Sequence, residues 1–182
     1  MLEIRFHGRG GQGTVVASNI LASAFFKEGK YAQAFPFFGG ERRGAPVAAF
    51  TRVDNKRIRL RCQIYFPDQV IVLDPTLIQV VDVTAGLKEG GLILANSDKG
   101  PKELGLGGRF RLATVDASAI ATRHGLGTKS APIVNTAILG AYSRASGLVS
   151  IQAVLEAVQE EVPAKREENA AAVMEAYHQV WL

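Results

Sequence analysis

The sequence predicts an α/β fold with a mostly parallel sheet, for three reasons. Short apolar runs typical of strands recur along the chain, at residues 2–6, 70–73 and 92–95. Segments with helical three-and-four spacing alternate with these runs, beginning with residues 14–26. A glycine turn at residues 7–13 joins the first strand to the first helix. These features indicate one Rossmann-like domain over residues 1–182, with an added antiparallel hairpin and a helical C-terminal third.

The glycine turn is the first candidate site. Gly8, Gly10 and Gly13 spell G-x-G-x-x-G, and backbone N–H groups before a helix favour an anion. A dinucleotide also requires a carboxylate about 20 residues further on, but residues 31–34 contain no acid. Three other uses of the turn stay open: close helix–sheet packing, a phosphate contact and a contact with a partner chain.

Composition excludes several functional classes. The chain has 47% hydrophobic and 21% charged residues, and it has no apolar run as long as the ~20 residues of a membrane span. Cys62 is the only cysteine, so an internal disulfide or an iron–sulfur cluster with about four thiolates cannot form on this chain. We therefore expect a cytoplasmic protein whose redox centres lie on other chains. The three histidines show no metal-ligand spacing.

Charge is unevenly distributed. Residues 42–61 have a net charge of +6, whereas residues 156–175 have −4. Nucleic acid binding is disfavoured because aromatics do not interleave with the basic residues as a stacking platform requires. The alternatives are a solvated edge hairpin and docking on an acidic surface or phosphate group.

Residues 30–44 are the second candidate site. Four aromatics within residues 31–38 precede Gly39 and Gly40, and Arg42 and Arg43 follow before Gly44. Charges between glycines are costly to bury. We expect a strand that leads into an exposed loop, which presents two arginines beside aromatic surface, a composition enriched at interfaces.

The middle of the chain predicts a hairpin followed by a buried strand. Residues 47–53 and 57–65 both read as strands, joined by a polar turn at 54–56. On the second of these, Cys62 falls on the apolar face and is expected to be a buried, inert thiol. Asp74 ends a buried strand, where it is expected to cap a helix that starts at Pro75, or to belong to a site.

The last third of the sequence predicts helices. Asp116 and Ser150 are expected to cap helices, residues 133–146 to form another, and Pro163 to begin the final one. Gly140 lies inside a helical pattern and implies that another element packs closely there.

Two long motifs, in order, resemble the gamma subunit of the 2-oxoacid:ferredoxin oxidoreductases. The first is Gly8-Arg9-Gly10-Gly11-Gln12-Gly13. The second has two parts, Tyr31-Ala32-Gln33-Ala34-Phe35-Pro36-Phe37-Phe38-Gly39 and then Glu41-Arg42-Arg43-Gly44-Ala45-Pro46-Val47. Weaker similarities run over the rest of the chain, at residues 59–61, 67–75, 135–141 and 165–172. The motif forms are most similar to the pyruvate and ketoisovalerate versions, although which 2-oxoacid is used stays open.

The resemblance implies a subunit without a complete active site. The family's complexes decarboxylate a 2-oxoacid oxidatively, form the acyl-coenzyme A and pass electrons to ferredoxin or flavodoxin. Thiamine diphosphate and iron–sulfur clusters are expected on partner subunits, and this chain is expected to serve assembly and coenzyme A engagement. A diphosphate at Gly10, Gly11, Gln12 and Gly13, or beside Arg42 and Arg43, would suit that role. A scaffold that binds no small molecule, and a stand-alone NAD or nucleotide enzyme, are the alternatives.

Overall fold

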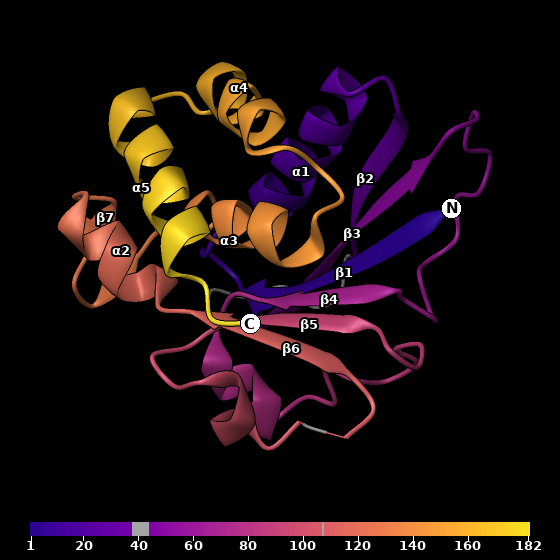
Figure 1. Cartoon of the computed structure of the whole chain (residues 1–182), viewed down its shortest axis with the longest axis horizontal. Helices are drawn as coiled ribbons and strands as arrows, with labels where there is room; N and C mark the ends of the chain where they lie inside the picture. Colours follow the sequence, from indigo (N-terminus) through magenta and orange to yellow (C-terminus); the bar gives the residue numbers. More distant parts are fainter. Residues whose placement is uncertain (38–43, 107) are drawn as a thin grey trace.

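The computed structural model describes residues 1–37, 44–106 and 108–182. Its centre is a six-stranded sheet in the order β2-β3-β1-β4-β5-β6 (Figure 1). The strands are β1 (Leu2–Arg9), β2 (Tyr31–Phe37), β3 (Pro46–Asp54), β4 (Gln69–Val72), β5 (Leu92–Asn96) and β6 (Arg111–Val115). A small separate hairpin pairs β7 (Gly127–Thr128) with β8 (Ala131–Pro132).

The strand directions confirm the predicted fold class. β1, β4, β5 and β6 form consecutive parallel pairs. β3 runs antiparallel to both β1 and β2, so the antiparallel addition to the sheet is the β2–β3 pair. The sheet is therefore mostly parallel, as the continuous apolar runs of β4 and β5 indicate.

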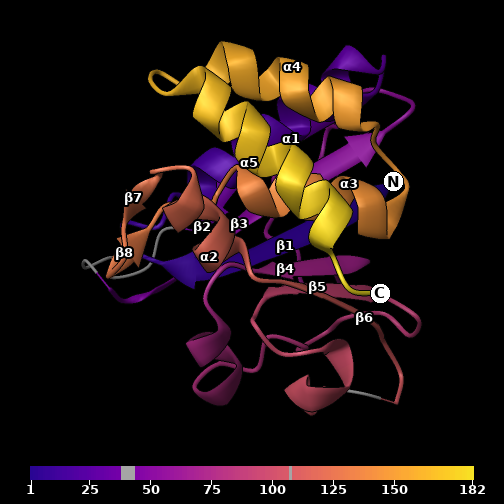
Figure 2. The same ribbon diagram turned by 60° about the vertical axis from the view of Figure 1, so that its left-hand side comes forward.

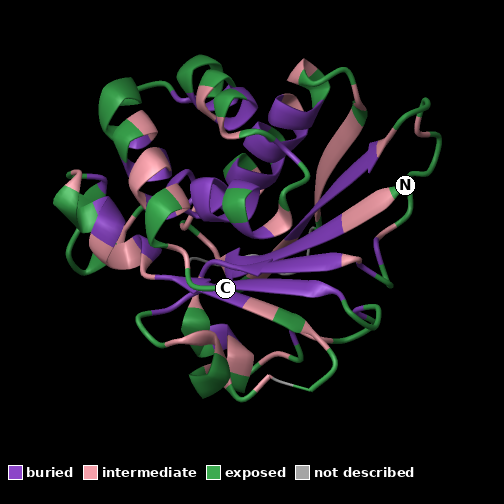
Figure 3. Ribbon diagram, viewed as in Figure 1, coloured by how far each residue is buried: buried purple, intermediate pink, exposed green. Residues whose placement is uncertain are grey.

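Helices cover one face of the sheet and short irregular segments cover the other (Figures 1 and 2). The helices are α1 (Thr14–Lys27), α2 (Ala117–Arg123), α3 (Ala137–Ser146), α4 (Ile151–Glu161) and α5 (Arg166–Gln179). The other face carries the 3₁₀ turns η1 (Pro75–Gln79) and η2 (Pro101–Leu104). The sheet is consequently buried between the two layers, with the larger apolar core on the helical side (Figure 3).

The predicted hairpin of residues 47–53 and 57–65 is wrong in its second strand. β3 forms as expected, but residues 57–65 belong to no strand. The physical reason is that β1 and β2 occupy both edges of β3, so no edge is left for a further strand. Cys62 lies in this segment and is exposed, which corrects the expectation of a buried thiol.

Several predicted helix ends are confirmed. Asp116 accepts a hydrogen bond from the Ala119 N–H at 2.8 Å, and Ser150 accepts one from Ala153 at 3.2 Å. Two starts are wrong. The helix expected from residue 133 begins at Ala137, because the preceding residues form β8 and the loop that follows it. The final helix begins at Arg166 instead of Pro163, since Lys165 has a left-handed backbone with φ of 53°.

Candidate functional site

The glycine turn lies at the carboxyl end of the sheet, between β1 and β4. From β1 the chain first builds β2 and β3 on one side of that strand, and then crosses to build β4 on its other side. This reversal is the position where open α/β sheets bind ligands, beyond the carboxyl ends of their strands. The turn also leads into α1, whose first N–H groups lack helical acceptors.

Close packing accounts for two of the three motif glycines. A Cβ on Gly8 would lie 2.1 Å from Thr14 Oγ1, and one on Gly13 would lie 2.4 Å from Asn135 Nδ2. Gly13 also has a φ of 76°, which disfavours any side chain. The turn thus brings α1 close to both the end of β1 and the start of α3, as the packing interpretation expects.

The glycine turn is joined to Gly44 and Ala45, which follow the two arginines of the second motif in the sequence. The Gly10 N–H donates to Ala45 O at 2.9 Å, and the Gly44 N–H donates to Gly10 O at 3.0 Å. The glycine turn is therefore fastened to the end of the loop that carries Arg42 and Arg43. Those two arginines lie outside the described residues.

The backbone donors of the turn are only partly used. Gly10 donates to the loop as described, and the Gln12 N–H donates to Arg9 O at 3.0 Å. Gly11 and Gly13, in contrast, have no backbone acceptor within the part of the chain that the structure describes. These two N–H groups are the ones that the fold leaves available to an anion.

A polar network fixes the turn to the end of β4. The Arg9 guanidinium donates to Asp74 Oδ2 at 3.2 Å, to Thr76 Oγ1 at 2.7 Å and to Gly44 O at 3.0 Å. Gln12 Nε2 donates to the same Asp74 oxygen at 2.9 Å, while Gln12 Oε1 accepts the Arg9 N–H at 2.7 Å. Arg9 and Gln12 thereby link the glycine turn, the arginine loop and η1.

Asp74 has its predicted capping role. It caps η1 by accepting the Thr76 N–H at 2.9 Å, and it is the acceptor at the centre of the network. Burial alone would raise the pKa of Asp74, but hydrogen bonds from Thr76 and Gln12 outweigh burial and hold that pKa below its usual value. The side chain is therefore an anion at neutral pH. The helix expected to follow it is only a short 3₁₀ turn.

We expect Asp74→Asn to destabilise the chain by about 1–2 kcal/mol more than Asp82→Asn, since hydrogen bonds to a charged acceptor contribute about 1.5–3 kcal/mol. Asp82 is a matched control because it binds the N–H and hydroxyl of Thr84 as Asp74 binds those of Thr76. Asp82, however, receives no side-chain hydrogen bond like those from Arg9 and Gln12 among the described residues. Urea unfolding measures both values, and equal losses would contradict the network's importance.

Two buried polar atoms at the start of α1 have no partner among residues 1–37, 44–106 and 108–182. They are Thr14 Oγ1 and Asn135 Oδ1, on side chains that are 2% and 7% exposed. Next to Asn135, the Thr136 hydroxyl donates to Asn169 at 2.7 Å and so joins α3 to α5. The sequence signalled this Asn-Thr pair only through its resemblance to the family.

The described part of the chain carries no cluster of three or more potential metal ligands from His, Cys, Asp and Glu. In the same residues, no helix is long and apolar enough to cross a membrane. The strand β2 has no acid at its end, where a ribose of NAD would be bound.

Comparisons with known proteins identify the family of the chain. The family model of pyruvate ferredoxin/flavodoxin oxidoreductase matches residues 3–179. The common subunit gamma of the pyruvate/ketoisovalerate oxidoreductases of Thermococcus kodakarensis is 57% identical over 182 residues, which covers 98% of this chain and 96% of that protein. Subunit PorC of the pyruvate synthase of Methanothermobacter thermautotrophicus is 51% identical and covers 99% and 96%.

A solved structure has the same fold. Subunit PORC of the pyruvate oxidoreductase of Thermotoga maritima superposes with a TM-score of 0.83 at 34% identity, and the match covers 98% of this chain and 96% of that one. With a relative at 57% identity over almost the whole length, the chain belongs to the pyruvate ferredoxin/flavodoxin oxidoreductase family, as one of its gamma subunits.

Proposed function

We propose that this chain is the gamma subunit of a complex that oxidises pyruvate or a branched-chain 2-oxoacid to the acyl-coenzyme A and passes the electrons to ferredoxin or flavodoxin. The observation that carries the proposal is the 57% identity to a subunit shared by pyruvate and ketoisovalerate oxidoreductases. Thiamine diphosphate and iron–sulfur clusters belong to partner subunits, since the single cysteine of this chain cannot hold a cluster of about four thiolates.

The whole range 1–182 acts as one gamma domain in the cytoplasm, with roles in assembly and in coenzyme A engagement. Two observations support the second role: the N–H groups of Gly11 and Gly13 have no backbone acceptor among the described residues, and Gly44, which follows Arg43 in the sequence, is bonded to the turn. A diphosphate is a double anion, and it is recognised by backbone donors at a helix start together with arginines. The coenzyme A site therefore comprises Gly10, Gly11, Gln12 and Gly13 with Arg42 and Arg43.

The NAD alternative finds no support. A ribose carboxylate, which NAD binding requires, is missing from β2. The relatives named above are subunits of 2-oxoacid oxidoreductases.

The first test is an anaerobic pull-down of the tagged chain from its native host. The eluate is assayed for coenzyme A-dependent reduction of a viologen dye with several 2-oxoacids. Co-elution of thiamine- and iron–sulfur-containing subunits with activity is the expected result, and the rates rank pyruvate against branched-chain acids. A chain that elutes alone and inactive from cells that carry out the reaction would contradict the proposal.

The coenzyme A role is tested in the assembled complex with Arg42→Ala/Arg43→Ala. We expect the KM for coenzyme A to rise at least about tenfold while the KM for the 2-oxoacid stays unchanged, because loss of a single charge-assisted contact of about 1.4 kcal/mol has that effect. Lys102→Ala/Lys129→Ala is the control, since both lysines are exposed elsewhere on the chain. An unchanged KM for coenzyme A in an intact complex would favour a pure scaffold.

A further inference from the structure

Residues 55–66 connect β3 to β4. They have the sequence pattern of a strand, but they are not paired with any strand of the described part of the chain. We call this segment the β3–β4 strap. Arg57, Arg59 and Arg61 alternate with Ile58, Leu60 and Cys62, which is a strand pattern. Among the described residues, no backbone–backbone hydrogen bond involves the strap. Apart from the Asn55 N–H, which donates to Asp54 Oδ1, and Gln63 O, which accepts from Arg52, the described contacts leave its N–H and C=O groups available to a strand or loop of another chain.

The strap is nevertheless held in a definite place. Arg52 of β3 is 1% exposed and donates to Gln63 O at 3.4 Å and to Cys62 Sγ at 3.7 Å. The same guanidinium donates to Glu3 Oε1 at 2.8 Å, which neutralises its charge. Ile64 is 1% exposed and anchors the far end of the strap. Because these contacts already order the segment, a partner that binds it incurs less conformational entropy loss.

The strap is strongly basic. Lys56, Arg57, Arg59 and Arg61 give it a net charge of +4 without a single acid, and all four residues are exposed. No salt bridge within the described part of the chain involves any of them. Lys30 lies at the same end of the molecule, where its Nζ donates to Asn55 Oδ1 at 2.7 Å. A surface of opposite charge would relieve the repulsion among these cations.

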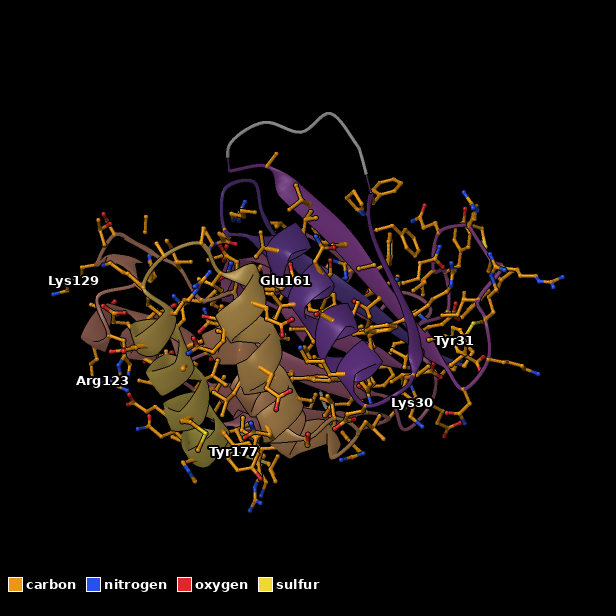
Figure 4. All side chains as sticks on the ribbon, turned by 90° about the horizontal axis from the view of Figure 1, so that it is seen from above. Lys30, Tyr31, Arg123, Lys129, Glu161 and Tyr177 are labelled. Carbon is orange, nitrogen blue, oxygen red and sulfur yellow. The ribbon has the colours of Figure 1, made fainter. Side chains whose placement is uncertain are left out.

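Apolar and aromatic side chains accompany the charges. Tyr65 is 63% exposed, Phe66 is 67% exposed and Leu60 is 46% exposed. Tyr31, at the start of β2, is 50% exposed and lies beside Lys30, on the side of the molecule opposite Arg123 and Lys129 (Figure 4). Arginine and tyrosine are among the residues that most often dominate binding energy at protein interfaces.

We propose that the β3–β4 strap docks in extended form on an acidic, partly apolar surface of another subunit of the oxidoreductase complex. This inference rests on the proposed function, and it specifies which surface of the chain mediates assembly and what chemistry the partner presents. Arg57 and Arg61 are at most about 14 Å apart along an extended chain, so carboxylates on one strand or one helix of the partner reach all three arginines.

The charge of the rest of the chain argues against other occupants. Helices α4 and α5 carry exposed acids, which repel a long polyanion such as RNA; they are Glu156, Glu160, Glu161, Glu167 and Glu168. A second copy that placed its own acidic helices on the strap would form a head-to-tail contact, because α5 and the strap lie on opposite sides of the molecule (Figure 1). Such a contact builds chains of molecules unless it closes into a ring.

The test uses the co-expressed complex, captured through a tag on a partner subunit. We expect Arg57→Glu/Arg59→Glu/Arg61→Glu to weaken the association of the gamma chain by at least about tenfold, since like charges would then face each other. The matched control reverses three exposed cations on other elements, as Lys102→Glu/Arg109→Glu/Lys129→Glu, and should assemble normally. A thermal midpoint close to that of the wild-type chain shows that each variant is folded.

A second measurement needs no charge reversal. Association of the wild-type chain should weaken as ionic strength rises, and Arg57→Gln/Arg59→Gln/Arg61→Gln should remove most of this salt dependence. Normal assembly of the glutamate variant would overturn the inference while leaving the proposed function intact. A wild-type chain that joins no other subunit would overturn both. Loss of RNA binding or of self-association, with assembly unchanged, would also overturn the inference.

Discussion

Replacement of Gly140 by alanine should destabilise the chain by about 3 kcal/mol or more, the upper end of the range for overpacked cores. Gly140 lies in α3, where α5 crosses it, and a Cβ at this position would lie 1.9 Å from the carbonyl oxygen of Val173. The contact is with a backbone atom, so no side-chain rotation relieves it and the two helices must separate. Val173 is itself fully buried, which spreads the displacement into the core.

Chemical denaturation of the purified chain measures this loss, with Gly29→Ala as the control. Gly29 also gains a Cβ, but nothing lies within 4 Å of it, and its φ of 77° imposes only a local cost of about 1–2 kcal/mol. A Gly140→Ala variant no less stable than Gly29→Ala would contradict the close approach of α3 and α5.

Lowering the pH from 7 to 5 should cost about 2 kcal/mol of stability through His7 alone, from the linkage between protonation and unfolding. His7 is 8% exposed on β1, and Arg5 Nε donates to its Nε2 at 3.0 Å. Burial, together with the neighbouring Arg5 charge, lowers the pKa of His7 from 6.5 to about 3, although Asp82 acts in the opposite direction. The folded chain thus keeps this imidazole neutral well below pH 6.5.

The direction of the effect follows from the two protonation states. Between pH 6.5 and about 3, the unfolded chain binds a proton at His7 and the folded chain does not, so the free energy of unfolding falls as the pH falls. Above pH 6.5 His7 is mostly neutral in both the folded and the unfolded chain, so this loss of stability is absent. His7→Gln keeps an acceptor for Arg5 but cannot titrate, and it should flatten the slope of stability between pH 7 and 5. Equal slopes for wild type and His7→Gln would contradict the assignment.

Local sequence rules placed most elements correctly because they depend on neighbours within a few residues. The short apolar run at residues 2–6 predicted β1, and the caps at Asp116 and Ser150 form as expected. Gly140 was correctly interpreted as a site of close packing, since a glycine inside a helix otherwise costs about 1 kcal/mol. The long glycine and arginine motifs also identified the family, as the relatives confirm.

The sequence failed where the outcome depended on distant competitors. Alternation at residues 57–65 is a valid strand pattern, but β1 and β2 already pair with both edges of β3. Because residues 57–65 form no strand, Cys62 lies exposed on the strap and not, as was expected, on the buried face of a strand. The hydrogen bonds of Asp74 with Arg9 and Gln12 could not be predicted from the sequence either, because they join residues that are 65 and 62 positions apart.

By itself, then, the sequence determined the α/β class, the glycine turn before α1, the family and the basic character of residues 55–66. Each of these depends on residue identity or on spacing along the chain. Only the tertiary structure decided which strands pair, and that the glycine turn is joined to Gly44 and to Asp74. It also decided that the strap pairs with no strand among the described residues. Pairing and long-range hydrogen bonds are competitions among all segments at once, and a local pattern shows only that a segment is able to compete.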